Sequence, residues 1–194
     1  MSDSERDAGM PQRASVGAVA EEQASAGRDE DNQYLTFRLH GEMYAFGILN
    51  VKEILEYGKV TEVPMMPDFI QGVINLRGEV VAVVNLARRF RFEAPAVTKR
   101  TCVVIIEVPG EEGHQELGVM VDSVSEVLQI PAEDIRAAPG FGARIRADFI
   151  KGMGKVGDDF VIILAEDRVL SVDELAMVEQ LRQDTGQNAE AQGE

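Results

Sequence analysis

An internal repeat is the feature of this 194-residue chain that most constrains its fold. The segment "FGILNVKEIL" (46–55) is similar to "LGVMVDSVSEVL" (117–128), with Gly47 matching Gly118. A two-residue insertion then aligns Val51 with Val124, Glu53 with Glu126, Ile54 with Val127 and Leu55 with Leu128.

A second pair of similar segments follows in the same order. "FIQGVINLRGEVVAVVNL" (69–86) is similar to "FIKGMGKVGDDFVIIL" (149–164), and after one deletion Gly78 matches Gly157. Because both pairs keep their order, the chain is expected to contain two copies of one structural unit.

The units are expected to consist of short β-strands. Leu35, Phe37 and Leu39 alternate with more polar residues, as in a strand with one buried face. Further β-rich runs cover 43–48, 80–86, 101–108, 117–124 and 160–165, separated by Gly, Pro and charged residues. The fold class is therefore mostly β, with two small barrels side by side and a groove between them.

The expected helix is C-terminal. Ser171 and Glu174 form an S-x-x-E capping box, and apolar residues recur at helical spacing from 172 to 181. Residues 1–33 have few large apolar side chains and are expected to form a disordered acidic tail. The folded domain is expected over 34–183, with a second disordered tail over 184–194.

Charge and hydropathy exclude several classes of partner. The net charge of -15 leaves no basic surface for nucleic acid or an anionic membrane. Apolar runs are too short to cross a bilayer, so no direct membrane insertion is expected. The start "MSDSERDAGM" lacks the features of a secretory signal, so we expect a cytoplasmic protein.

A glycine pattern raises the alternative of a nucleotide-binding enzyme. Gly152, Gly154 and Gly157 spell G-x-G-x-x-G, but "DDFVIIL" follows where a dinucleotide site needs a helix. We predict that Gly152 and Gly157 are turn or bulge glycines of the repeat. His40 and His114 lie in no nucleophile or metal-ligand pattern, so we expect no catalytic residue, cofactor or metal site.

Binding residues are better indicated. In "NVKEILEYG", a strand places Val51, Glu53, Leu55 and Tyr57 on one face, mixing apolar and charged side chains. Arg77 lies beside a glycine between apolar runs. An arginine in this setting is most often a solvated turn residue, and it can also be an interface anchor or pair with a carboxylate such as Glu53.

The sequence as a whole resembles the CheW family of chemotaxis coupling proteins. The similarity runs from about Tyr34 to Leu181, and its most specific parts are "VKEI", "FIQGVINLRG" and "VDSVSEVL". The resemblance implies two intertwined five-stranded SH3-like barrels around a shared core, in a scaffold without catalytic activity.

The resemblance also implies partners and contact residues. Expected partners are the regulatory domain of a CheA-type histidine kinase and the cytoplasmic tips of chemoreceptors, in arrays that keep the protein peripheral to the inner membrane. Similar adaptors serve twitching or developmental signalling pathways. A role in such a pathway is a closer alternative than a nucleotide-binding enzyme. The positions expected to contact receptor or kinase are Val51, Glu53, Ile54, Gly72, Arg77, Gly78, Val124 and Val127.

Overall fold

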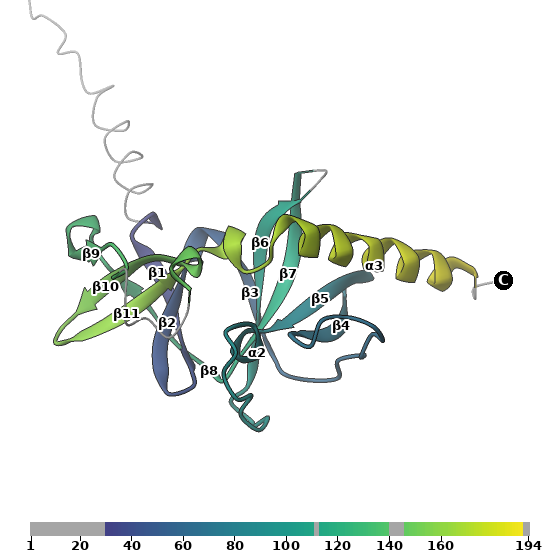
Figure 1. Ribbon diagram of the computed structural model, residues 1–194, viewed down its shortest axis with the longest axis horizontal. Coiled ribbons are helices and arrows are strands. Elements are labelled where there is room, and N and C mark those ends of the chain that lie inside the picture. The colour runs from purple at the N-terminus through teal and green to yellow at the C-terminus, as the bar shows by residue number, and fades with distance from the viewer. Residues whose placement is uncertain (1–29, 111–112, 140–145, 192–194) are drawn as a thin grey trace, which may run out of the picture.

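A computed structural model describes residues 30–110, 113–139 and 146–191. The described residues form eleven strands in two sheets, which Figure 1 shows as a left and a right half. Sheet A has the order β8-β1-β2-β11-β10-β9, and sheet B has the order β3-β6-β7-β5-β4. The strands are β1 (Gln33–Leu39), β2 (Glu42–Gly47), β3 (Val51–Glu56), β4 (Ile70–Leu76), β5 (Glu79–Asn85), β6 (Cys102–Gly110), β7 (Gly113–Val121), β8 (Ser123–Gln129), β9 (Ile135–Arg136), β10 (Ile150–Val156) and β11 (Asp159–Leu164).

The two sheets exchange strands between the repeat copies. The first copy comprises β1 to β5, and its equivalents in the second copy are β6, β7, β8, β10 and β11. Sheet A combines β1 and β2 with strands of the second copy, whereas sheet B combines β6 and β7 with strands of the first. Each barrel therefore takes one hairpin from one copy and three strands from the other, which intertwines the halves.

The β4–β5 and β10–β11 hairpins have the same geometry. The pairing register shifts next to Gly72 in the first and next to Gly152 in the second, so both hairpins contain a β-bulge at the same place. The shift leaves Gly72 opposite Val83 and Gly152 opposite Ile163. These bulges confirm that the glycines of the repeat are bend positions.

The turns of these hairpins correct the sequence alignment. One turn consists of Arg77 and Gly78, and the other consists of Gly157 and Asp158. Because both hairpins close after equivalent strand residues, Gly157 is equivalent to Arg77. The predicted match of Gly157 with Gly78 is wrong by one position, and no deletion separates the copies here.

The parallel pairs correct the first alignment as well. Ala45 lies beside Ile163 on β11, and Gly118 lies beside the equivalent Val83 on β5. Gly118 is therefore equivalent to Ala45, and its predicted match with Gly47 is wrong. With this register the two copies align without the predicted two-residue insertion. The predicted matches between residues of β3 and β8 are unchanged.

Alternation along each strand creates three apolar clusters. Within β5, Val81 and Val83 point into barrel B, the barrel of sheet B, whereas Ala82 and Val84 point to the cluster between the sheets. The interior of barrel A, the barrel of sheet A, contains Tyr34, Ala45, Ile130, Val161 and Ile163. The cluster between the sheets is the expected shared core, and it includes Phe37, Tyr44, Phe46, Val104, Ile106, Leu117 and Leu164.

Helix α3 (Val172–Ala191) begins at the predicted capping box and packs against β5 (Figure 1). The Glu174 backbone N–H donates to Ser171 Oγ at 3.3 Å, and the Ser171 N–H donates to Glu174 Oε2 at 2.7 Å, which confirms the box. The helix runs to Ala191, past the expected domain boundary at residue 183. The predicted tail over 1–33 lies largely outside the described residues, so its disorder stays a prediction.

Five short helices connect the strands. They are η1 (Ile48–Asn50), α2 (Leu86–Arg89), η2 (Ala132–Asp134), η3 (Ala147–Phe149) and η4 (Glu166–Arg168). Across the described ranges, no helix is long and apolar enough to cross a membrane.

Candidate functional site

β3 is an edge strand with one face turned to solvent. Val51, Glu53 and Leu55 are half-buried, while Lys52, Ile54 and Glu56 are exposed, which confirms the predicted alternation. Val51 packs against the shared core. Ile54 keeps 43% of its surface exposed.

Glu53 and Arg77 form an ion pair across the open end of barrel B. Arg77 Nη2 lies 2.8 Å from Glu53 Oε1, with side-chain exposures of 73% and 25%. The pairing that the sequence left open is therefore present, and Arg77 is also a largely solvated turn residue. Most of the guanidinium remains exposed, so Arg77 keeps donors for a second acceptor.

The backbone of Arg77 has an unusual conformation. Its φ of 54° lies in the left-handed region, and Gly78 follows with a φ of 90°. Two successive positive φ values are required by the tight hairpin turn, where Asn or Gly normally precedes Gly. Strained residues of this kind cluster at functional sites.

The structure favours glycine at positions 72 and 78 for different reasons. Gly72 is buried with a φ of +145°, and a Cβ atom there would lie 2.2 Å from the Thr61 carbonyl oxygen. A Cβ at Gly78 meets nothing within 4 Å. Gly72 thus permits close backbone packing, whereas Gly78 only permits the turn.

β8 is an edge strand of sheet A and the equivalent of β3. Val124 packs against the shared core as Val51 does, and Val127 is 47% exposed as Ile54 is. The register against β1 shifts between these two valines, as it does within β3. The predicted contact positions thus occupy equivalent places on two edge strands.

The eight predicted residues do not form one cluster of contacting side chains. Six lie on β3, β4 and the turn that follows it, and two lie on β8. Glu53 and Arg77 are brought together directly. Val51 and Val124 both pack against the shared core. The groove between the barrels stays a prediction.

An ion pair on the exposed face of β3 adds charge beside this site. Lys52 pairs with Glu107 of β6, and His114 Nδ1 lies 4.0 Å from the same carboxylate. The hydrogen bond from Lys52 holds the pKa of Glu107 below its ordinary value, and the pKa of Lys52 is raised in return.

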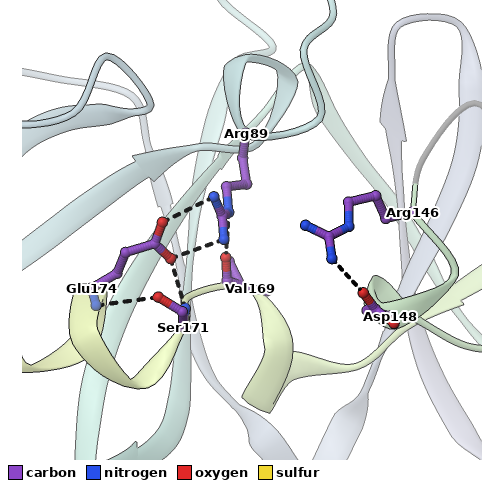
Figure 2. Close-up of polar contacts among 6 residues, drawn as sticks. All are labelled: Arg89, Arg146, Asp148, Val169, Ser171 and Glu174. Atoms are coloured by element: carbon purple, nitrogen blue, oxygen red, sulfur yellow. Dashed lines mark hydrogen bonds and ion pairs between the residues drawn. The ribbon is translucent and has the colours of Figure 1, made fainter.

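Arg89 is a structural residue that sequence reasoning missed. Its Nη1 and Nη2 atoms donate to the two Glu174 oxygens at 3.1 and 2.9 Å, and its Nε donates to the Val169 carbonyl at 2.8 Å (Figure 2). The capping box identified Glu174 as a helix cap, but nothing in the sequence indicated a distant arginine as its partner. This contact fastens α3 to α2.

The glycine motif has no dinucleotide-site context. Gly152 and Gly154 lie within β10, and Gly157 lies in the turn to β11, so a strand follows where a helix is required. Cβ atoms at Gly152 and Gly154 would approach Ile135 and Ile130 to within 3 Å. Within the described ranges, no group of three or more His, Cys, Asp or Glu side chains is placed to hold a metal ion.

Comparisons with known proteins agree with this architecture. The CheW-like domain family matches residues 33–174. Chemotaxis protein CheW of Klebsiella aerogenes is 35% identical over 154 residues, covering 79% of this chain and 90% of the relative. Chemotaxis protein CheW of Treponema pallidum is 30% identical, covering 76% and 86%. Protein FrzA of Myxococcus xanthus is 30% identical, covering 63% and 74%.

A solved structure shares the fold. The crystal structure of scaffolding protein TtCheW from Thermoanaerobacter tengcongensis superposes with a TM-score of 0.68 at 30% identity, covering 74% of this chain and 90% of that one. The family match extends over most of the described strands and both halves of the repeat. The chain therefore belongs to the CheW family.

Proposed function

We propose that this protein is a non-catalytic adaptor that couples the cytoplasmic tips of chemoreceptors to a CheA-type histidine kinase. It acts in the cytoplasm, peripheral to the inner membrane through the receptor array. The observation that carries the proposal is the Glu53–Arg77 pair, an exposed cation held in a turn with positive φ, in a member of the CheW family. Ile54 is exposed on the other face of β3.

The chemistry of this surface favours binding over catalysis. The exposed guanidinium of Arg77 is of a residue type that is enriched at protein interfaces. A receptor tip is a helical bundle, so one of its helices can bury an apolar residue against Ile54 or Val127. Coupling then requires only that the adaptor hold kinase and receptor in fixed positions.

A binding titration tests the proposal. The purified chain is titrated separately with the kinase regulatory domain and with a soluble receptor fragment, and kinase activity is measured with all three components. We expect saturable binding to both and higher kinase activity in the ternary mixture. Failure to bind either partner would refute the proposed function.

Two variants tie the binding to the named surface. Arg77→Glu reverses the exposed charge beside Glu53 and should weaken assembly, with an unchanged circular dichroism spectrum. Arg146→Glu is the matched control, because Arg146 is 77% exposed in its own ion pair with Asp148 and belongs to none of the predicted contacts. An Arg77→Glu protein that is unfolded would show that Arg77 is structural instead.

The match to FrzA supports a second candidate of the same build. That relative is not named as a chemotaxis protein, so the family extends beyond proteins with that name. An adaptor of another receptor–kinase pathway, such as twitching or developmental signalling, would use the same surface. Pull-down from the source organism separates the two, because the recovered kinase and receptor belong to one pathway.

A further inference from the structure

A cavity lies between the β6–β7 hairpin and the start of α3, which are neighbours in Figure 1. Its volume is about 670 Å³, which is within the range of ligand pockets. The apolar part of its wall consists of Pro109, Leu170, Leu175 and Ala176. Leu170 is 3% exposed, and Leu175 and Ala176 are half-buried, so the cavity has an apolar floor.

A buried amide side chain in this cavity lacks a partner. Gln115 of β7 lines the cavity and is only 8% exposed, yet its carboxamide makes no hydrogen bond with any residue in the described ranges. No fully enclosed side-chain nitrogen or oxygen in those ranges is without a partner, so the carboxamide must reach the open space of the cavity. A carboxamide both donates and accepts hydrogen bonds, as a peptide group does. The cavity therefore favours an occupant that brings apolar side chains together with backbone N–H and C=O groups.

The described part of the chain begins close to this cavity. Tyr34 of β1 pairs with Gly47, and the Gly47 N–H donates to Glu166 Oε1 at 2.6 Å. Glu166 is the first residue of η4, and the next two residues of η4 line the cavity. The 29 residues that precede Glu30 are therefore attached to the fold near the cavity.

One stretch of those 29 residues has the required apolar character. Residues 16–20 read VGAVA, and residues 1–29 contain no leucine or isoleucine and no valine other than Val16 and Val19. Val19 precedes Glu30 by eleven residues, and an extended chain of that length spans about 36 Å. The stretch can therefore reach the cavity from the start of β1.

Charge complementarity supports the same occupant. A second cavity of about 340 Å³ shares Pro109 and Asp167 with the first and extends to Lys151 of β10. Lys151 is exposed and has no ion pair within the described ranges. Glu21 and Glu22 follow the VGAVA stretch on the side that leads to β1, so their carboxylates complement this ammonium group. The carboxylates that line the second cavity already have partners, and they are Glu107, Glu166 and Asp167.

We propose that residues 16–20 dock in the cavity between α3 and the β6–β7 hairpin, with Val16 and Val19 on its apolar floor and a peptide group on Gln115. The link to β1 keeps the local concentration of the segment high, so a short apolar contact is sufficient. Docking would fasten the start of α3 to the hairpin. The family match begins at residue 33, so this contact belongs to a part of the chain outside the matched domain. The expectation of a disordered tail then excludes this stretch.

Hydrogen exchange of the full chain, followed by mass spectrometry, is the first test. We expect the backbone amides of residues 16–20 to exchange about tenfold more slowly than free peptide, and those of residues 2–9 to exchange at the free rate. Combined Val16→Ser and Val19→Ser should abolish this protection. Combined Ala24→Ser and Ala26→Ser is the matched control and should leave it intact. All four positions lie outside the described strands and helices, so the comparison does not depend on their packing.

The cavity provides a second test from the opposite side of the contact. Ala176→Phe places a large side chain in the cavity from α3, and we expect it to raise exchange at residues 16–20 to the rate of the double serine variant. The side-chain NH₂ signals of Gln115 provide a readout by nuclear magnetic resonance that leaves the cavity unaltered. They should shift when Val16 and Val19 are replaced and stay in place in the Ala24 and Ala26 control.

Three results would overturn the inference. Wild type without protection at residues 16–20 would show that the stretch does not dock. Protection that increases with protein concentration would assign the cavity to a second copy of the chain. Protection that persists in Ala176→Phe, or Gln115 signals that do not respond to the double serine variant, would place the stretch elsewhere. Thermal unfolding of Ala176→Phe verifies that released protection does not reflect lost folding.

Discussion

Phe69 and Phe149 lie at equivalent positions of the two repeat copies and flank the same guanidinium, that of Arg89. The Cζ atom of Arg89 is 4.6 Å from the ring centroid of Phe69 and 5.2 Å from that of Phe149. The backbone carbonyls of both phenylalanines accept equivalent bonds, from Asn85 and Ala165. One arginine thus joins both copies of the repeat and, through Glu174, the C-terminal helix.

This relationship predicts a large effect of Arg89→Ala on stability. The side chains of Arg89 and Glu174 are only 16% and 22% exposed, so removing the arginine leaves a largely buried carboxylate without its partner. We expect a loss of about 2–4 kcal/mol in the free energy of unfolding, measured by urea denaturation.

Arg146→Ala is the matched control for that loss. Figure 2 shows Arg146 paired with Asp148 near the same site, but the two side chains are 77% and 64% exposed. An exposed pair contributes less than about 1 kcal/mol. Equal losses for the two arginines would contradict a joining role for Arg89.

Arg77→Asn separates binding from folding. Asn before Gly is preferred in a turn with two positive φ values, so this change relieves the strain at Arg77 while removing the cation. We expect the free energy of unfolding to stay within about 1 kcal/mol of wild type or to rise. Partner affinity should fall by about tenfold in the same preparation, measured by calorimetric titration. A variant that is strongly destabilised would assign Arg77 a structural role.

The sequence predicted β1, β2, β5, β6, β7 and β11 because apolar alternation is a local signal, but it did not mark β4, β9 or β10 as strands. It predicted the capping box from its S-x-x-E spacing. The Glu53–Arg77 pair was only one of several roles open to an arginine in that setting, because its distant partner carries no local signal.

The residue patterns alone do not show the exchange of strands between copies, and only the family resemblance implied intertwined barrels. Both the exchanged and the unexchanged arrangement bury the same faces, so hydrophobic patterning does not distinguish them. Register was missed as well. Matching glycine to glycine misaligned Gly78 with Gly157, because Gly78 is the second residue of its turn and Gly157 is the first residue of the other.

The Lys52–Glu107 pair predicts a pH-dependent contribution to stability. The lowered pKa of Glu107 gives a contribution that is present above the ordinary glutamate pKa, about 4.3, and lost as pH falls through the lower folded value. The raised pKa of Lys52 gives a contribution that is present below the ordinary lysine pKa, about 10.4, and lost as pH rises through the higher folded value. Both are therefore present at neutral pH.

Thermal unfolding of wild type and Glu107→Gln measures this contribution. We expect a higher midpoint for wild type near pH 7 and a difference that shrinks at acidic pH and in high salt, because the pair is exposed. A difference that is constant from pH 3 to pH 7 would show that the glutamate acts by packing and not by charge.

Gly72→Ala and Gly78→Ala distinguish a close backbone contact from a turn requirement. At Gly72 the new Cβ would lie 2.2 Å from the Thr61 carbonyl oxygen, and Thr61 and Val73 exchange two backbone hydrogen bonds of 2.9 and 2.8 Å, so the backbone must move. We expect a loss of about 3 kcal/mol or more in the free energy of unfolding. At Gly78 only the φ of +90° opposes the change, so about 1–2 kcal/mol is expected. Any loss of partner binding in Gly72→Ala would then follow from displacement of the 57–69 segment against β4. Gly78→Ala should keep the fold, so a loss of partner binding in that variant would be due to the turn that holds Arg77 against Glu53.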